Sequence, residues 1–126
     1  MKTKFFAVFF ITILCFSLAA CDDAKRPIDS PDTKWICESD GISFSVSEDG
    51  KITNAVMTDK NGEKIDISLV FSDMSEGKVS ITNADGSEIY ISGTCTYEKD
   101  KFTVTVTDIY NTNISVSSPM LIFNKK

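Results

Sequence analysis

The stretch IYISGTCTYEKDKFTVTVT, residues 89–107, carries the clearest structural signal in this sequence of 126 residues. In residues 89–97 every second side chain is apolar or small, and polar side chains lie between them. Residues 102–107 repeat this alternation, with threonines in the polar positions. Side chains alternate between the two faces of a β-strand, so both halves are predicted strands with one buried face. The charged residues 98–100 between them predict an antiparallel hairpin.

The same alternation recurs on both sides of this hairpin. Ser, Thr and β-branched residues fill these segments, as the pleated and half-buried surface of a sheet favours. No segment after the N-terminal region has the apolar stripe of an amphipathic helix. The remaining strands are expected at residues 35–37, 42–47, 52–56, 65–71, 79–81 and 120–124.

Asp-Gly and Asn-Gly dipeptides separate several of these strands, at residues 49–50, 61–62 and 85–86. Both central residues of a type I′ turn have positive φ, which these residue types tolerate, so the dipeptides predict type I′ hairpins. Turns that recur at intervals of about 9 to 15 residues indicate an up-and-down meander. We therefore expect an all-β domain over residues 33–126, with about eight antiparallel strands closed into a small barrel, because closure covers the apolar faces and removes the edges. A two-layer β-sandwich is the alternative.

The first 20 residues differ from the rest. Lys2 and Lys4 precede an almost unbroken apolar run over residues 5–20, which is shorter than a bilayer-spanning helix and ends in small residues. These features predict a signal peptide over residues 1–20. The run ends in Leu-Ala-Ala-Cys at residues 18–21, which resembles the lipobox of bacterial lipoproteins. The resemblance implies cleavage before Cys21, acylation of Cys21 and a place on the extracytoplasmic face of the cell membrane.

Residues 21–32 read as the lipid anchor and a flexible tether. This segment contains Pro27, Pro31, many charges and one isolated apolar residue, Ile28. Such a composition buries too little apolar surface to order itself. The domain is therefore expected to begin near residue 33.

Charge and composition exclude several functions. Cleavage leaves 106 residues that hold all 18 acidic and 11 of the 13 basic residues, for a net charge of −7. This acidity argues against a nucleic-acid partner, which requires a basic surface. The chain has no histidine, so it lacks the commonest general base and metal ligand. We expect a protein that is not an enzyme and needs no metal or cofactor. Residues 59–63, with Asp59 and Glu63 at their ends, suit a hairpin turn better than a calcium loop.

The candidate site residues fall into three groups. Cys37 and Cys95 are expected either to form a disulfide or to remain as two buried thiols. A polar stretch of Asn and Ser residues at 108–119 is a candidate interaction loop, with Tyr110, Asn111 and Asn113 within it. An eight-stranded barrel is either filled by its own side chains or holds one small ligand, and both alternatives stay open here. The side chains that would line such a ligand cavity are Trp35, Phe44, Ile67, Phe71, Ile91 and Phe102.

Two families of small β-barrel lipoproteins share short motifs with this chain. In lipocalin-like lipoproteins a Trp opens the first strand, and a late Gly-Thr-x-x-Tyr segment precedes a strand rich in Thr; Trp35, residues 91–97 and residues 102–107 are similar. That resemblance implies a barrel that binds an apolar ligand. Membrane-bound inhibitors of c-type lysozyme carry an aromatic residue, a Cys and a Gly in the first strand, and a Ser-Gly-x-x-Tyr loop. Residues 35–41 resemble the first motif, and residues 92–97 resemble the second with one additional residue before the Tyr.

Two hypotheses of function follow. The first is a lipid-anchored, non-enzymatic binding protein that takes up a small apolar molecule or a component of the cell envelope. The second is a protein-interaction module, such as a lysozyme inhibitor or an accessory subunit of an envelope complex. The first requires a cavity inside the barrel, whereas the second requires an exposed apolar and acidic patch, for instance at Tyr90 or Tyr110.

Overall fold

The structure, a computed structural model, describes residues 24–126. Eight β-strands and two single-turn 3₁₀ helices account for the regular structure of this part of the chain. None of its helices is long and apolar enough to cross a membrane. In chain order the elements are η1 (Pro27–Asp29), β1 (Thr33–Cys37), η2 (Glu38–Asp40), β2 (Ile42–Val46), β3 (Ile52–Thr58), β4 (Lys64–Phe71), β5 (Lys78–Asn83), β6 (Ile89–Tyr97), β7 (Lys101–Ile109) and β8 (Met120–Lys125).

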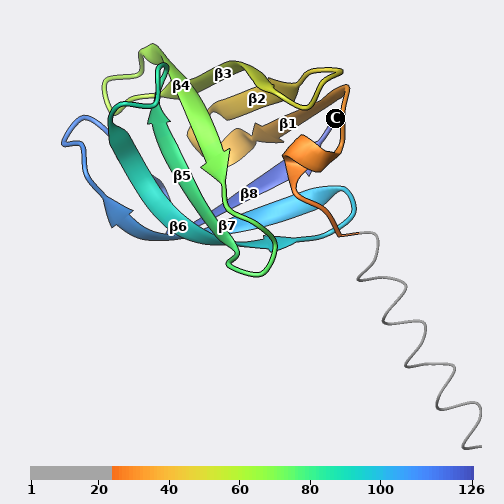
Figure 1. Cartoon of the computed structure of the whole chain (residues 1–126). Coiled ribbons are helices and arrows are strands. Elements are labelled where there is room, and N and C mark those ends of the chain that lie inside the picture. The colour runs from red at the N-terminus through yellow and green to blue at the C-terminus, as the bar shows by residue number, and fades with distance from the viewer. Residues whose placement is uncertain (1–23) are drawn as a thin grey trace, which may run out of the picture.

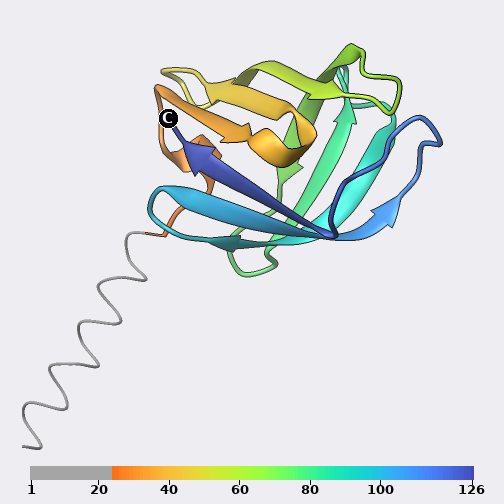
Figure 2. The ribbon, with the colours of Figure 1, turned by 180° about the vertical axis from the view of Figure 1, so that it is seen from behind.

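The eight strands form a closed antiparallel barrel in which each strand pairs with its neighbours in sequence (Figures 1 and 2). Closure is completed by β1 and β8, where Trp35 pairs with Lys125 and Ile36 with Asn124. The most extensive pairing joins β6 and β7, from Ile91 opposite Ile109 to Tyr97 opposite Phe102. The predicted meander and barrel closure are therefore confirmed, and the alternative of a two-layer sandwich is wrong.

A meander places successive connections at opposite ends of the barrel. One end carries the start of the described chain, the connections 47–51, 72–77 and 98–100, and the C-terminus; we call it the proximal end. The other, the distal end, carries η2 and the connections 59–63, 84–88 and 110–119. In Figure 1 the 110–119 connection lies at the left, opposite the side on which the coloured part of the chain begins.

The hairpin turns differ from the type I′ expectation. Gly50, Gly62 and Gly86 have φ of +82°, +84° and +80°, but the residue before each glycine keeps a negative φ. The amide of each glycine donates to the carbonyl three residues earlier, for example Gly62 N to Asp59 O at 3.0 Å. This is the pattern of a type I turn followed by a left-handed glycine. The type I′ prediction is wrong because these loops are longer than two residues and need a left-handed residue only at the glycine.

The segment before β1 packs against the barrel. Pro27 is buried, Ile28 is half-buried against the core, and η1 spans Pro27–Asp29. The Arg26 guanidinium donates to both carboxylate oxygens of Asp29, at 2.8 and 3.1 Å, and to the Ser72 carbonyl at 3.1 Å. Residues 26–32, which we expected to be tether, are therefore part of the folded domain, because the local ion pair and the buried Pro27 supply the order that composition alone did not indicate.

Candidate functional site

The six side chains proposed to line a cavity all lie in the barrel interior. Trp35, Phe44, Ile67, Phe71, Ile91 and Phe102 are each at most 7% exposed. Four of them are aromatic, and together with Tyr97 and Phe123 they form a continuous cluster. Phe102 lies at its centre: its ring stacks on Phe123 at a centroid distance of 4.5 Å and meets Trp35 edge-on at 5.4 Å.

The aromatic cluster fills the space in which a ligand would lie. Phe44 contacts the Phe71, Phe102 and Phe123 rings at centroid distances of 5.8–6.2 Å, which are the usual separations of packed aromatic pairs. Three hollows formed by described residues all open on the outside, and none is lined by any of the six side chains. Sequence reasoning therefore identified the interior residues correctly, and the structure brings them together as a packed core.

Cys37 and Cys95 are both free thiols. Cys37 lies buried on β1, with its Sγ 3.5 Å from the Ser39 hydroxyl, whereas Cys95 lies on β6. Of the two alternatives that the sequence left open, the structure has the unpaired thiols. The third candidate cysteine, Cys21, lies outside the described residues.

Cys95 and Tyr97 are neighbouring, half-buried side chains on the inner face of β6. Burial raises the pKa of the Cys95 thiol to about 11, from an ordinary value of 9.0. Burial also raises the pKa of the Tyr97 hydroxyl, and the neighbouring Cys95 adds to this increase. The Tyr97 Oη is buried and has no hydrogen-bond partner among the described residues. Both groups are neutral at physiological pH, so neither is an activated nucleophile.

The distal end carries a hollow with a volume of about 440 Å³. It opens between η2, the β3–β4 turn and the segment 115–117. Two carboxylates, one ammonium group and several hydroxyls line it, so it suits a hydrogen-bonding ligand better than an apolar one. The lining residues are Ser39, Asp40, Gly41, Thr58, Asp59, Lys60, Gly62, Ser115, Val116 and Ser117.

Asp40 and Lys60 hold the wall of this hollow in place. The Asp40 carboxylate accepts hydrogen bonds from the Ser117 amide at 2.7 Å and from the Ser117 hydroxyl at 3.2 Å. The Lys60 amide donates to Asn113 O at 2.9 Å, and its Nζ donates to Thr112 O at 3.0 Å. Sequence reasoning missed Asp40, Lys60 and Ser117, since partners as many as 77 residues apart leave no local signal.

The candidate interaction loop closes over the distal mouth of the barrel. Tyr110 is 59% exposed and reaches into solvent. The Asn111 carboxamide accepts from the Asn113 amide at 2.8 Å and donates to Glu88 at 3.4 Å, so both asparagines serve the loop's own structure. Ile114 is only 5% exposed and joins the core. The sequence places Ile114 in a polar loop and does not indicate that its side chain is buried in the core.

The described chain has no group of three or more Cys, Asp or Glu side chains that could hold a metal ion. Several turn carboxylates have a lowered pKa because neighbouring hydroxyls and amides donate to them, such as Asp73 beside Ser75 and Asp85 beside Ser87. These are ionised turn-stabilising groups.

Fold and surface together define the chain as a small, filled, eight-stranded antiparallel β-barrel with an external hollow at its distal end. Comparisons with protein-family models, with curated proteins and with solved structures found no match to this chain.

Proposed function

We propose that this chain is a non-enzymatic, lipid-anchored binding module outside the cytoplasm, which binds a component of the cell envelope through its distal end. The observation that carries the proposal is the filled interior: with the barrel centre occupied by Phe102 and its aromatic neighbours, a binding surface must lie on the outside. The distal end carries the hollow, and three exposed apolar side chains lie at the distal ends of β6 and β7: Ile89, Ile109 and Tyr110. Exposed aromatic and aliphatic side chains beside polar groups are typical of binding surfaces.

The lipid anchor in this proposal rests on the lipobox-like residues 18–21. Uptake of a small apolar molecule into the barrel gains no support, because none of the three hollows described above is lined by the aromatic cluster. The lysozyme-inhibitor hypothesis gains no observation either, since residues 92–97 lie within β6 and Gly93 is buried.

Site-specific photo-crosslinking in native envelopes tests the proposal. A photoreactive side chain at Tyr110 probes the distal end, and the same group at Thr105, exposed on the outer wall of β7, is the matched control. We expect a discrete crosslinked product from position 110 that is absent from position 105, with the attached component identified by mass spectrometry.

A second measurement tests the filled interior. Titration with a fluorescent fatty acid is expected to leave the emission of the buried Trp35 unchanged. Saturable fatty-acid binding that alters Trp35 emission, or equal crosslinking at positions 105 and 110, would contradict binding through the distal end.

A further inference from the structure

Basic residues are concentrated at the proximal end of the barrel. Each charged strand residue lies within three positions of a strand end, so every charge of the described chain can be assigned to one end. The proximal end holds eight acidic residues and nine of the 11 basic ones; the distal end holds eight acidic residues and two lysines. The nine proximal basic residues are Lys25, Arg26, Lys34, Lys51, Lys78, Lys99, Lys101, Lys125 and Lys126.

Ion pairs add to this difference in charge between the two ends. Four proximal carboxylates are paired with a proximal Lys or Arg, at 2.8–3.9 Å. Of the distal carboxylates, only Glu38 belongs to an ion pair within the described chain, with Lys126 at 3.8 Å. The proximal end is thus nearly neutral, and the distal end presents unpaired negative charge. The four proximal pairs are Arg26–Asp29, Lys51–Asp49, Lys101–Glu98 and Lys125–Asp100.

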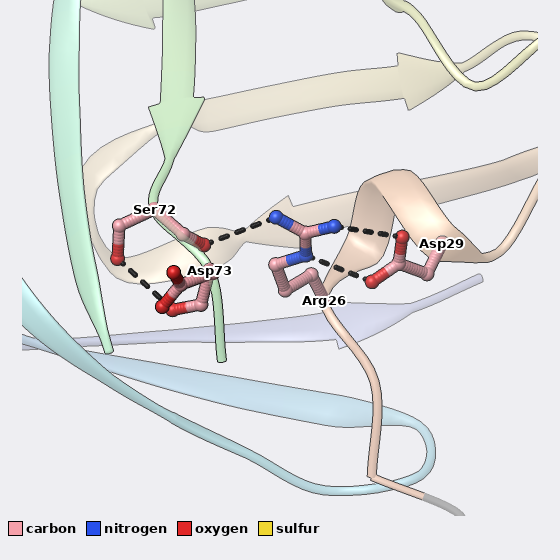
Figure 3. A network of polar contacts seen from close by, with 4 residues as sticks. All are labelled: Arg26, Asp29, Ser72 and Asp73. Carbon is pink, nitrogen blue, oxygen red and sulfur yellow. Dashed lines mark hydrogen bonds and ion pairs between the residues drawn. The ribbon is translucent and has the colours of Figure 1, made fainter. Parts of the chain in front are cut away.

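The chain joins the barrel at this same proximal end. Figure 3 shows the Arg26 guanidinium between the Asp29 carboxylate and the Ser72 carbonyl, which ties the first described residues to the β4–β5 connection. That connection, residues 72–77, carries Met74, a large apolar side chain that is 47% exposed. An exposed Met beside the point where the chain enters is positioned to contact whatever surface the chain is attached to.

The length of the chain between Cys21 and the barrel limits how the barrel can be oriented on the membrane. Five residues separate Cys21 from Arg26, which at most reach about 18 Å. The nine-residue strands β6 and β7 are about 30 Å long, and a barrel tilt of roughly 40° leaves about 22 Å along the axis. If the distal end rested on the bilayer instead, Arg26 would lie at least about 22 Å from the bilayer surface. The five-residue link, which reaches about 18 Å at most, could not span that distance.

We propose that the proximal end rests on the bilayer surface, with Met74 among the lipid headgroups and the distal end facing away from the membrane. The inference rests on the acylation of Cys21 that belongs to the proposed function. Its partner is a phospholipid surface. Anionic lipids repel the distal end, with its unpaired carboxylates, more strongly than the nearly neutral proximal end, so charge and link length favour the same orientation.

Tryptophan variants of the full-length lipidated protein test this orientation. Met74→Trp probes the proximal end, Tyr110→Trp the distal end and Ile122→Trp the outer wall, all at exposed apolar positions. The proteins are reconstituted into vesicles of phosphatidylcholine and phosphatidylglycerol with a headgroup spin-labelled phospholipid as quencher. We expect loss of fluorescence for Met74→Trp, and no loss beyond that of the wild type, which retains the buried Trp35, for the other two.

Lysine acetylation of the wild-type protein gives a second readout that needs no substitution. Lys25, Lys78 and Lys99 should react more slowly on vesicles than in detergent, whereas the distal Lys60 and Lys64 should not change. Vesicle-bound protein with equal or greater quenching at position 110 or 122, or with equal acetylation of both groups, overturns the orientation and leaves the anchor intact. A mature chain whose intact mass shows no lipid on Cys21 overturns the anchor and the orientation together.

Discussion

At the scale of single residues, Phe102 decides the character of the barrel. Its ring contacts the Trp35, Phe44, Phe71, Tyr97 and Phe123 rings at centroid distances of 4.5–6.2 Å. A side chain in this position removes the space that a carried ligand would occupy. The same dense packing makes it the residue on which the stability of the core depends most directly.

Truncation of Phe102 tests whether it is a structural or a ligand-contacting residue. Phe102→Ala is expected to lower the free energy of unfolding by about 3–5 kcal/mol, because it leaves a cavity among the surrounding rings. Urea unfolding monitored by Trp35 fluorescence measures the change. Thr103→Ala, on the outer face of the same strand, is the control and should alter stability by less than about 0.5 kcal/mol. If Phe102→Ala lowered the free energy of unfolding only slightly, the interior would be hollow and not packed.

The raised pKa of Cys95 predicts a loss of stability at alkaline pH. Its ordinary pKa is 9.0 and its folded pKa is about 11, so the fold favours the neutral thiol. The resulting stabilisation is complete below pH 9 and is lost as the pH rises from 9 to 11, because the unfolded thiol ionises first. The urea midpoint should therefore fall over this range, and fall less in Cys95→Ala. Equal slopes in the two proteins would show that Cys95 is not buried as described.

At the scale of elements, the 110–119 connection is held by residues far away in the sequence. Lys60 binds two of its carbonyls, Asp40 binds Ser117, and Ile114 inserts into the core. Its polar composition is typical of a mobile loop, yet its backbone and side chains have specific partners. The connection therefore acts as a fixed wall of the distal hollow.

Asp40→Ala tests this fixed wall. Loss of the two hydrogen bonds from Ser117 should increase amide hydrogen exchange over residues 111–118, and should lower the free energy of unfolding by about 1 kcal/mol. Hydrogen exchange measured by mass spectrometry resolves the segment. Asp66→Ala, which removes an exposed carboxylate from β4, should leave the exchange unchanged. Unchanged exchange in Asp40→Ala would mean that Ile114 and Lys60 suffice to hold the connection.

At the scale of the whole molecule, the folded domain begins before its first strand. Pro27 and Ile28 cover part of the core before β1 begins, and Arg26 ties this segment to the β4–β5 connection. The folded domain thus begins only a few residues after Cys21 in the sequence, which is the basis for its proposed orientation on the membrane.

Comparison of two chain lengths tests this boundary. A chain that begins at Thr33 should still fold, but should be about 2 kcal/mol less stable than one that begins at Ala24, because Pro27 and Ile28 no longer cover the core. Thermal and urea unfolding followed by circular dichroism provide the measurement. Arg26→Ala in the longer chain separates the contribution of the ion pair from that of the apolar contacts. Equal stability of the two chains would mean that residues 26–32 belong to the tether and not to the folded domain.

The sequence by itself determined the strands, the meander and the identity of the core, because period-2 alternation and short turns are local signals. It also indicated the interior positions Trp35 and Phe102. Only the tertiary structure decided that the interior is filled and that Cys37 and Cys95 are unpaired. Gly93 illustrates the reason: a Cβ there would lie 2.5 Å from the Thr105 carbonyl oxygen, across the β6–β7 pair. Contacts of this kind join distant parts of the chain, and their distances arise only when the barrel closes.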